Sequence, residues 1–545
     1  MISKERIYQN LLRLVAVPSV SGTDDEIKAA YKLEELLYEI PYFTVHRDHV
    51  KLVPLEGDPF GRCIVTAWLE ACPGNKRTVI LTGHYDVVDV EEYGHLQDKA
   101  YDVEAITGCI DGMPLDEDSR KDFESGEWLF GRGTADMKYG HALCLELLRH
   151  FSENGGINGN LLYVAVCGEE TNSEGMLRAL TFFNDFARKT GTEYEALLLA
   201  ECYMMEDQAR DMTRYVHFGA SGKLMPMFFF VGEATHGGEP FLGIDPNLMA
   251  AQVYARLHMT ASFCQRSRGE STPPPVCLKM QDLKNTYSVS TPLYTASYYN
   301  VITVNMDPAV LMEKLLTIGR DSFAAALEFI ERRSTEYEVF AGEKPVRYPI
   351  KACVKTFAEV YEAAKKAYDG DLDAHIGELV DGWQSEKFEI QDIAVKIVKR
   401  VYELNPDKQP TIIVSIIPPY YPDVYPDTEE PRAKKLLKCV EDVIAFAEVQ
   451  YGQTLKLKNY YMGISDMCYT GLDAGKNFDS LFKNLVGVNQ MYFLPEKDMR
   501  AFNVPGIVLG GYGKDFHKHT ERLHRQYNFD ILPHLYDQII RELLD

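Results

Sequence analysis

The stretch that decides the fold is VILTGHYDVV, residues 79–88, in which a continuous apolar run leads into two polar side chains, His84 and Asp86. Continuous rather than alternating hydrophobicity predicts a strand that is buried on both faces, which is typical of parallel sheets. Comparable strand patterns lie at 161–167 and 195–203, with helical patterns at 137–152 and 173–188. This alternation predicts an α/β domain whose mostly parallel sheet is covered by helices on both faces.

Length and composition narrow the class of protein. A chain of 545 residues exceeds the usual size of one hydrophobic core, so two domains are expected. The net charge of −24 disfavours nucleic acid and anionic membranes as partners. The N-terminal MISKERIYQNLLRLV lacks the apolar core of a signal peptide, and no run approaches the ~18 apolar residues of a membrane span. Eleven scattered cysteines without a CxxC pair favour a reducing cytoplasm.

The pattern changes at about residue 214. The segment RYVHFGASGKLMPMFFFVGE has strand character, and a helix, two strands and a long helix follow it as far as residue 333. This order predicts a β-α-β-β-α unit inserted into the α/β domain, which the helical patterns at 352–368 and 389–404 extend. We therefore divide the chain into a first part of the α/β domain, an inserted α+β unit and a second part of the α/β domain: 1–213, 214–420 and 421–545.

Ligands of open α/β sheets gather at the carboxyl ends of the strands. Metal-competent side chains follow several predicted strands or open the next helix: His84 and Asp86, Asp136, Glu169 and Glu170, Glu201, and much later His517 and His519. Each group alone is more often an ordinary polar residue, but their ordered occurrence at strand ends favours a metal site. A set of histidines and carboxylates without thiolates suits a catalytic Zn²⁺ site, with Mn²⁺ or Co²⁺ as alternatives.

Taken together, these segments resemble the M20 family of metallopeptidases, which includes carboxypeptidases, dipeptidases, aminoacylases and succinyl-diaminopimelate desuccinylases. The matching segments are GHYDVV, GRGTADMKYG, the GEE of CGEETNSEG, VGEATHGGEPFLGIDPN, the GISD of YMGISDMC, and HKHTE. They run from residue 83 to residue 521 in the order found in the family. The length and the extended insertion look most like the arginine-utilisation (RocB-type) branch. The resemblance implies a zinc-peptidase-like catalytic domain with an inserted lid and dimerisation domain.

The resemblance implies a role for each metal-competent residue. Asp136 would bridge two divalent ions, zinc first; His84 and Glu201 would complete one half of the site, and Glu170 and His517 the other. Two cations about 3.5–4 Å apart require such a shared carboxylate between them.

Three further residues receive roles in catalysis. Glu169 would act as the general base, and Asp86 would orient the ring of His84. His236, in the GEATHGG of the inserted unit, would stabilise the oxyanion, a contact worth about 3 kcal/mol in comparable hydrolases. In dimeric members of the family, the matching histidine often reaches the active site of the partner.

Three details of the resemblance can be tested in a structure. The family pattern has a Glu four residues after the histidine ligand, which selects His517 over His519. A cis peptide often follows the bridging aspartate, here at Asp136–Met137. Many members carry an Arg that grips the substrate carboxylate, whereas Met306 stands at the corresponding position here.

The leading hypothesis is a cytoplasmic hydrolase that cleaves an amide bond in a small peptide or N-acyl amino acid with water activated by two metal ions. A homodimer through the lid is expected, and dipeptidase, carboxypeptidase and deacylase activities remain open. The alternative is a non-catalytic metal-binding, ligand-binding or regulatory protein that keeps the fold. No cysteine pattern supports an activated thiolate, and no glycine-rich loop with Lys supports phosphate binding.

Overall fold

The computed structural model describes residues 2–203 and 209–545, which form two compact units. The first unit comprises Met1–Ser221, Val424–Leu472 and Pro495–Asp545, and the second comprises Gly222–Asp423 and Asp473–Leu494. The limits expected from the sequence differ, since they assigned 473–494 to the α/β domain.

An eight-stranded mixed sheet forms the centre of the first unit. Its strands, in spatial order, are β1 (Val50–Pro54), β2 (Cys63–Leu69), β5 (Asn160–Val166), β3 (Arg77–His84), β6 (Glu193–Leu199), β16 (Gly506–Val508), β7 (Arg214–His217) and β15 (Leu455–Lys458). The middle strands β5, β3, β6 and β16 are parallel, and antiparallel pairs occur toward both edges. This arrangement confirms the α/β fold class with a largely parallel central sheet.

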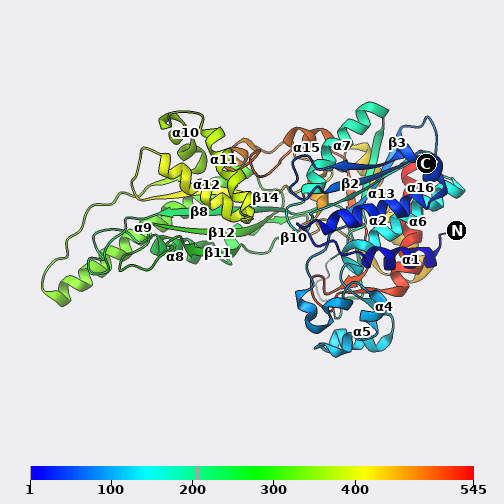
Figure 1. Cartoon of the computed structure of the whole chain (residues 1–545), viewed down its shortest axis with the longest axis horizontal. Coiled ribbons are helices and arrows are strands. Elements are labelled where there is room, and N and C mark those ends of the chain that lie inside the picture. The colour runs from blue at the N-terminus through cyan, green and yellow to red at the C-terminus, as the bar shows by residue number, and fades with distance from the viewer. Residues whose placement is uncertain (1, 204–208) are drawn as a thin grey trace. The chain divides into compact units, whose positions relative to one another are not determined.

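Helices cover both faces of this sheet, which explains the continuous hydrophobicity of its strands. All seven residues of β5 are buried, as are the last seven of β3. The longer helices of this unit are α1 (Lys4–Val15), α2 (Asp25–Tyr38), α6 (Tyr139–Asn154), α7 (Glu174–Thr190), α13 (Pro431–Tyr451) and α16 (Leu532–Leu544) (Figure 1). Helices α6 and α16 pack against β3, whereas α7 packs against β5.

The register of the parallel strands brings their carboxyl ends to one edge of the sheet. His84 on β3 pairs with Val166 on β5, and Thr82 pairs with Leu199 on β6. Val508 on β16 also pairs with Leu199. The segments that follow these strands therefore leave the sheet at the same edge.

The long segment between β3 and Asp136 folds into short elements. It contains a 3-10 helix (Glu91–Lys99), α4 (Val103–Thr107) and α5 (Glu117–Ser125), and it leads into β4 (Trp128–Phe130). Strand β4 joins β17 (Gly513–Lys514) and β18 (Arg522–His524) in a three-stranded sheet. The excursion at 91–127 is thus connected to the C-terminal region of the chain.

The second unit is built on a five-stranded sheet. Its order is β11 (Val276–Asp282), β12 (Tyr294–Thr303), β8 (Gly222–Val231), β14 (Thr411–Tyr421) and β13 (Val354–Thr356), and the three long strands at its centre run side by side (Figure 1). Its helices are α8 (Pro246–Leu257), α9 (Pro308–Ala341), α10 (Phe357–Ala367), α11 (Leu372–Ser385), α12 (Ile390–Leu404) and α14 (Asp479–Asn484). Helix α11 was not expected from the sequence.

Segment 473–494 belongs to this unit because its backbone hydrogen-bonds to β14. Val486 N donates to Ile416 O at 2.9 Å, and Leu485 forms a parallel bridge with Ile416. The side chain of Asn484 accepts a hydrogen bond from Ala358 N at 2.9 Å. These contacts depend on residues more than 60 positions away, so local sequence does not reveal them.

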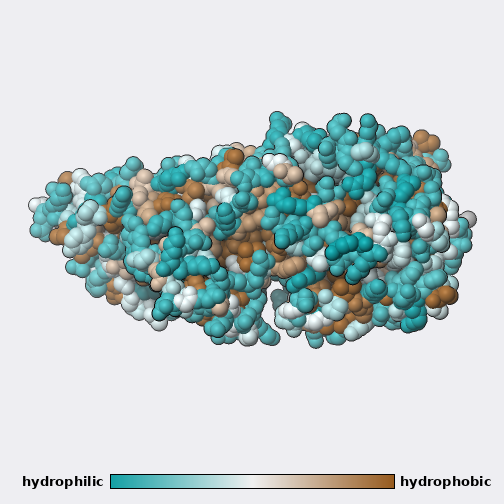
Figure 2. All heavy atoms as spheres, turned by 90° about the horizontal axis from the view of Figure 1, so that it is seen from above, coloured by the Kyte–Doolittle hydropathy of each residue, from teal (hydrophilic) through white to brown (hydrophobic). Residues whose placement is uncertain are grey.

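The remaining short elements are α3 (Pro41–Val45), α15 (Glu496–Phe502), β9 (Arg266–Ser267) and β10 (Glu270–Ser271). Among the helices that the structure describes, none has the length and apolar character needed to cross a membrane. The eleven cysteines, all within the described ranges, form no disulfide. Hydrophilic residues predominate on the face drawn in Figure 2, in keeping with the net charge of −24.

Candidate metal centre

Asp136 lies between two imidazole rings. Its Oδ1 is 3.1 Å from His84 Nε2, and its Oδ2 is 3.4 Å from His517 Nε2. Each imidazole has a second carboxylate beside it, because Glu201 Oε2 is 3.3 Å from His84 Nε2 and Glu170 Oε2 is 3.0 Å from His517 Nε2. The five residues expected to bind metal therefore form one cluster with two halves that share Asp136.

The two candidate histidines of the C-terminal segment lie in different surroundings. His517 faces Asp136 and Glu170. The hydrogen bond to Asp136 makes the largest contribution to raising the pKa of His517 to about 10, and the hydrogen bond to Glu170 adds to it. His519 instead places Nε2 2.9 Å from Pro114 O, outside the cluster. The structure thus brings His517 rather than His519 to Asp136, while its role as a metal ligand stays a prediction.

The backbone around Asp136 is held by a buried ion pair that sequence reasoning did not assign. The expected cis peptide at Asp136–Met137 is present. Glu521 Oε1 accepts hydrogen bonds from Ala135 N and Asp136 N at 3.1 and 3.2 Å. Arg132 Nη1 donates to Glu521 Oε2 at 2.6 Å, and Arg132 Nη2 donates to His517 O at 3.1 Å. The His-x-x-x-Glu spacing at the C-terminus was the signal that could have revealed this pair.

Asp86 links His84 to the turn that carries two glutamates. His84 Nδ1 lies 3.0 Å from Asp86 O and 3.6 Å from Asp86 Oδ1. The Asp86 carboxylate accepts hydrogen bonds from Glu169 N and Glu170 N at 3.2 and 3.1 Å, and from Ser21 Oγ at 2.6 Å. Burial raises the pKa of Asp86, but the hydrogen bond and charge of His84 outweigh it and hold the pKa below its usual value.

Glu169 lies beside the cluster without joining either half. Its Oε2 is 4.0 Å from His84 Nε2, and the residue is buried. Burial raises the pKa of Glu169 well above its usual value, and the charge of Asp466 adds to this rise. Asp466, in the GISD segment, is itself 1% exposed, and burial raises its pKa to about 8. The GISD segment is part of the resemblance, but the sequence predicted no role for Asp466.

The residues present fit divalent metal ions. One atom each from His84, Asp136 and Glu170 lie within 4.8 Å of one another, and so do one atom each from Asp136, Glu201 and Cys202. Glu201 Oε2 is buried and lies 3.3 Å from His84 Nε2, but within the described part of the chain no group donates a well-directed hydrogen bond to it. A buried carboxylate oxygen without a directed donor is costly, and a cation at this position would satisfy it.

The other oxygen of Glu201 is held by its neighbour in the chain. Cys202 N donates to Glu201 Oε1 at 3.2 Å, and Cys202 Sγ lies 3.5 Å from the same oxygen. Sequence reasoning treated the site as free of sulfur and did not consider Cys202. Its position directly after Glu201 was the available signal.

A glycine, Gly510, lies just after β16 and lets the backbone there approach Glu201, which lies just after β6. A Cβ atom at Gly510 would lie 1.4 Å from Glu201 O, so any side chain there requires the backbone to move. Close packing beside the cluster therefore depends on the absence of a side chain at Gly510.

His236 lies in the second unit, on the loop between β8 and α8, and is not among the residues of the cluster in the first unit. Its Nδ1 accepts a hydrogen bond from Gly238 N at 3.0 Å, so the neutral ring carries its proton on Nε2. The loop is anchored by Gly237 N, which donates to Val289 O at 3.0 Å. Its role in catalysis stays a prediction.

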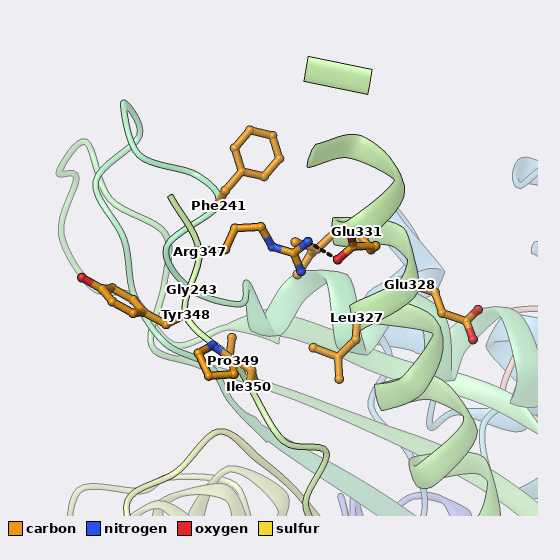
Figure 3. A pocket seen from close by; sticks show the side chains of 10 residues that line it. Phe241, Gly243, Leu327, Glu328, Glu331, Arg347, Tyr348, Pro349 and Ile350 are labelled. Atoms are coloured by element: carbon orange, nitrogen blue, oxygen red, sulfur yellow. Dashed lines mark hydrogen bonds and ion pairs between the residues drawn. The ribbon is translucent and has the colours of Figure 1, made fainter. Parts of the chain in front are cut away.

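The same loop lines a cavity of about 330 Å³ in the second unit (Figure 3). Phe241 and Gly243 of the loop contribute to its wall, together with residues of the helix α9 and of the segment that follows it. Arg347 of that segment forms an ion pair with Glu331 of α9. The ring of Phe241 also lies 5.6 Å from the ring of Tyr337, which secures the loop against α9.

Comparison with known proteins agrees with this geometry. The model of peptidase family M20/M25/M40 matches residues 80–541. The chain is 34% identical over 553 residues to the uncharacterized protein YqjN of Bacillus subtilis, covering 99% of this chain and 97% of that protein. It is 30% identical over 545 residues to protein RocB of the same organism, covering 99% and 95%.

Solved structures share the fold at lower identity. A tripeptidase from Staphylococcus aureus is 13% identical with a TM-score of 0.53, and the match covers 100% of this chain and 99% of that one. The dipeptidase Dug1p from Saccharomyces cerevisiae is 12% identical with a TM-score of 0.54, covering 99% and 96%. The extent of the family match and the full-length identity to RocB lead to one conclusion. The chain belongs to the M20/M25/M40 family of peptidases.

Proposed function

We propose that this protein hydrolyses an amide bond in a small peptide or an N-acyl amino acid, using water activated by two divalent metal ions. The observation that carries the proposal is the position of Asp136, whose two carboxylate oxygens face two imidazoles that each have a second carboxylate beside them. A shared carboxylate between two halves is what a two-metal hydrolase requires. The peptidase names of the structural neighbours support a peptide as the substrate.

The chain's own residues supply ligands and proton transfer. His84, Asp136, Glu170, Glu201 and His517 would hold two ions, zinc first and manganese or cobalt as alternatives, which would polarise the scissile carbonyl and acidify water. Glu169 accepts the proton of the attacking water and returns it to the leaving amine. Burial raises the pKa of Glu169, so its ionised form holds a transferred proton more strongly than an exposed glutamate does. Asp86 keeps Glu169 in position through the hydrogen bond from its backbone N–H.

The inserted unit contributes His236, and it has Met306 where many family members have an arginine. His236 donates a hydrogen bond from Nε2 to the oxyanion, a role that its Nδ1 contact with Gly238 supports. Met306 cannot grip a carboxylate as an arginine does. Dipeptides, carboxypeptidase substrates and acyl amino acids therefore all belong in the substrate screen.

We also propose a cytoplasmic homodimer that associates through the inserted unit. Strand β11 is at the edge of its sheet, and its residues Val276, Leu278 and Met280 are 41%, 50% and 47% exposed. Exposed edge strands with apolar side chains favour association with another chain. Light scattering of the wild type and of Leu278→Lys tests this, since the variant should be monomeric. The eleven scattered cysteines, without a CxxC pair, support a reducing compartment.

The test of the proposed function combines metal analysis with a substrate screen. Purified protein should contain two equivalents of Zn²⁺, Mn²⁺ or Co²⁺ and should cleave members of a panel of dipeptides and N-acyl amino acids. A chelator should abolish the cleavage, and the same ions should restore it. Metal binding without cleavage of any substrate would favour the alternative of a binding or regulatory protein.

A further inference from the structure

The segment that carries His517 has an unusual backbone. Asp515 and His517 both adopt the left-handed conformation, with φ of +56° and +66°. Residues other than glycine enter this region at a cost, so contacts elsewhere must stabilise it. His517 itself is half-exposed, and its side chain contacts Glu170 and Asp136 rather than an apolar core. The conformation therefore depends on the residues before and after His517.

Those residues are held by the helix α5 of the 91–127 excursion. Lys514 Nζ donates to both oxygens of Asp118 at 3.0 Å and to Asp122 Oδ2 at 2.9 Å. Arg522 donates from Nε to Asp122 Oδ2 at 2.7 Å and from Nη2 to Asp118 Oδ2 at 2.6 Å. Two aspartates one helical turn apart thus bind one cation on each side of His517. We call these four residues the α5 clamp.

The clamp is also connected to the left-handed segment directly. Asp515 forms a hydrogen-bonded ion pair with Arg522 Nη1 and accepts a hydrogen bond from Thr520 Oγ1 at 2.9 Å. Arg522 Nη1 also donates to Thr520 O at 3.1 Å. Arg522 is thereby bonded to both α5 and the turn that contains His517.

Burial makes this network rigid. The side chain of Arg522 is fully buried, and those of Lys514 and Asp122 are 5% and 11% exposed. Buried ion pairs with several hydrogen bonds have defined geometry, and the loss of one partner leaves an uncompensated charge. The carboxylates and cations of the clamp satisfy one another, so its residues have a positional role and do not form a second ligand site.

We propose that Asp118 and Asp122 are positioning residues that hold His517 at the half of the metal centre it shares with Glu170. This inference rests on the proposed two-metal function. It assigns to segment 91–127, which contains α5, the role of positioning a metal ligand. Within the described structure, no hydrogen bond or ion pair joins His84 or Glu201, in the other half, to the clamp. The clamp therefore acts on one of the two metal equivalents.

The experiment is a metal titration of the full-length, chelator-stripped protein with Zn²⁺, followed by a competing chromophoric chelator. The variant Asp118→Asn/Asp122→Asn keeps the shape of both side chains but removes their charges. Its affinity for one of the two Zn²⁺ equivalents should fall about 10- to 100-fold, the usual effect of losing residues that support a ligand. Its affinity for the other equivalent should match that of the wild type.

The matched control is Glu117→Gln/Glu124→Gln. Both glutamates lie on α5, both are exposed, and neither side chain forms a hydrogen bond or ion pair within the described structure. This control removes the same charge from the same helix, so both affinities should stay unchanged. Asp118→Asn alone, which leaves Asp122 bonded to both cations, provides a milder variant with a smaller loss in the same direction, should the double variant fail to fold.

The outcomes separate this inference from the proposed function. A wild type that takes up no divalent metal overturns both. Two unchanged affinities in the double or single variant overturn the inference alone. Equal weakening of both equivalents, together with a lower melting temperature, also overturns it, because the clamp would then only stabilise the fold.

Discussion

Replacing Arg132 by Met should strongly destabilise the first unit. Arg132 and Glu521 are both 1% exposed, and their side chains form an ion pair at 2.6 Å. Met preserves most of the apolar length of Arg but removes the charge and the hydrogen bonds to Glu521 Oε2, His517 O and Asp89 O. Glu521 would remain buried as an uncompensated carboxylate.

The size of the effect follows from this burial. Removing one partner of a buried pair typically costs about 3–5 kcal/mol of unfolding free energy. Burial raises the pKa of Glu521, and the charge of Arg132 opposes that rise, so the pKa of Glu521 should be higher still in the variant. A carboxyl group with a folded pKa above its unfolded value destabilises the protein as pH rises between the two values. The loss should therefore be larger at about pH 8 than at about pH 5.

The assay is urea unfolding of the metal-free protein, because bound metal would add its own stabilisation. Tryptophan fluorescence reports on the first unit through Trp68 and Trp128. The double variant Arg132→Met/Glu521→Gln should recover at least half of the loss, since Gln still accepts the backbone hydrogen bonds. Lys4→Met, which breaks an exposed pair with Asp530, is the control and should leave the unfolding midpoint nearly unchanged. A loss below about 1 kcal/mol for Arg132→Met, or no recovery in the double variant, would refute the reasoning.

Three further predictions concern the site itself. Glu169→Gln should lower kcat by about 10²–10⁴-fold without changing the metal content, as measured by steady-state kinetics and elemental analysis; loss of metal instead would make Glu169 a ligand. Gly510→Ala should cost about 1–3 kcal/mol in thermal unfolding because its Cβ would lie 1.4 Å from Glu201 O. Gly377→Ala, where nothing lies within 4 Å, should be neutral or stabilising. His236→Ala should lower kcat about 100-fold or more with little change in KM, and an unchanged kcat would remove it from the mechanism.

Local sequence was sufficient for the elements that carry the candidate ligands. His84 and Glu201 follow or end apolar runs whose continuity predicts strands buried on both faces. Because parallel strands end at one edge of a sheet, these side chains were expected near one another before any coordinates were known. The choice of His517 depended on the resemblance, since its immediate surroundings do not distinguish it from His519.

Other features could not be read from the sequence, because they depend on residues that are distant along the chain. Segment 473–494 joins the second unit through β14. Helix α11 packs in one hydrophobic core with residues of α10, α12 and β14, and these partners cannot be recognised from the sequence of α11 alone. Val380 and Ile376 of α11 are fully buried there, although the helix contains two glycines and several charges.

The sequence by itself determined the α/β class and the polar residues that follow its strands. Together with the resemblance, it also indicated which four residues would lie around Asp136. Only the tertiary structure decided which side chains support them. The bonds from Arg132 to Glu521 and from Lys514 to Asp122 join positions 389 and 392 residues apart. Hydrophobic periodicity is a local property of the chain, whereas a buried ion pair requires two charges to meet within about 3 Å, which folding alone can arrange.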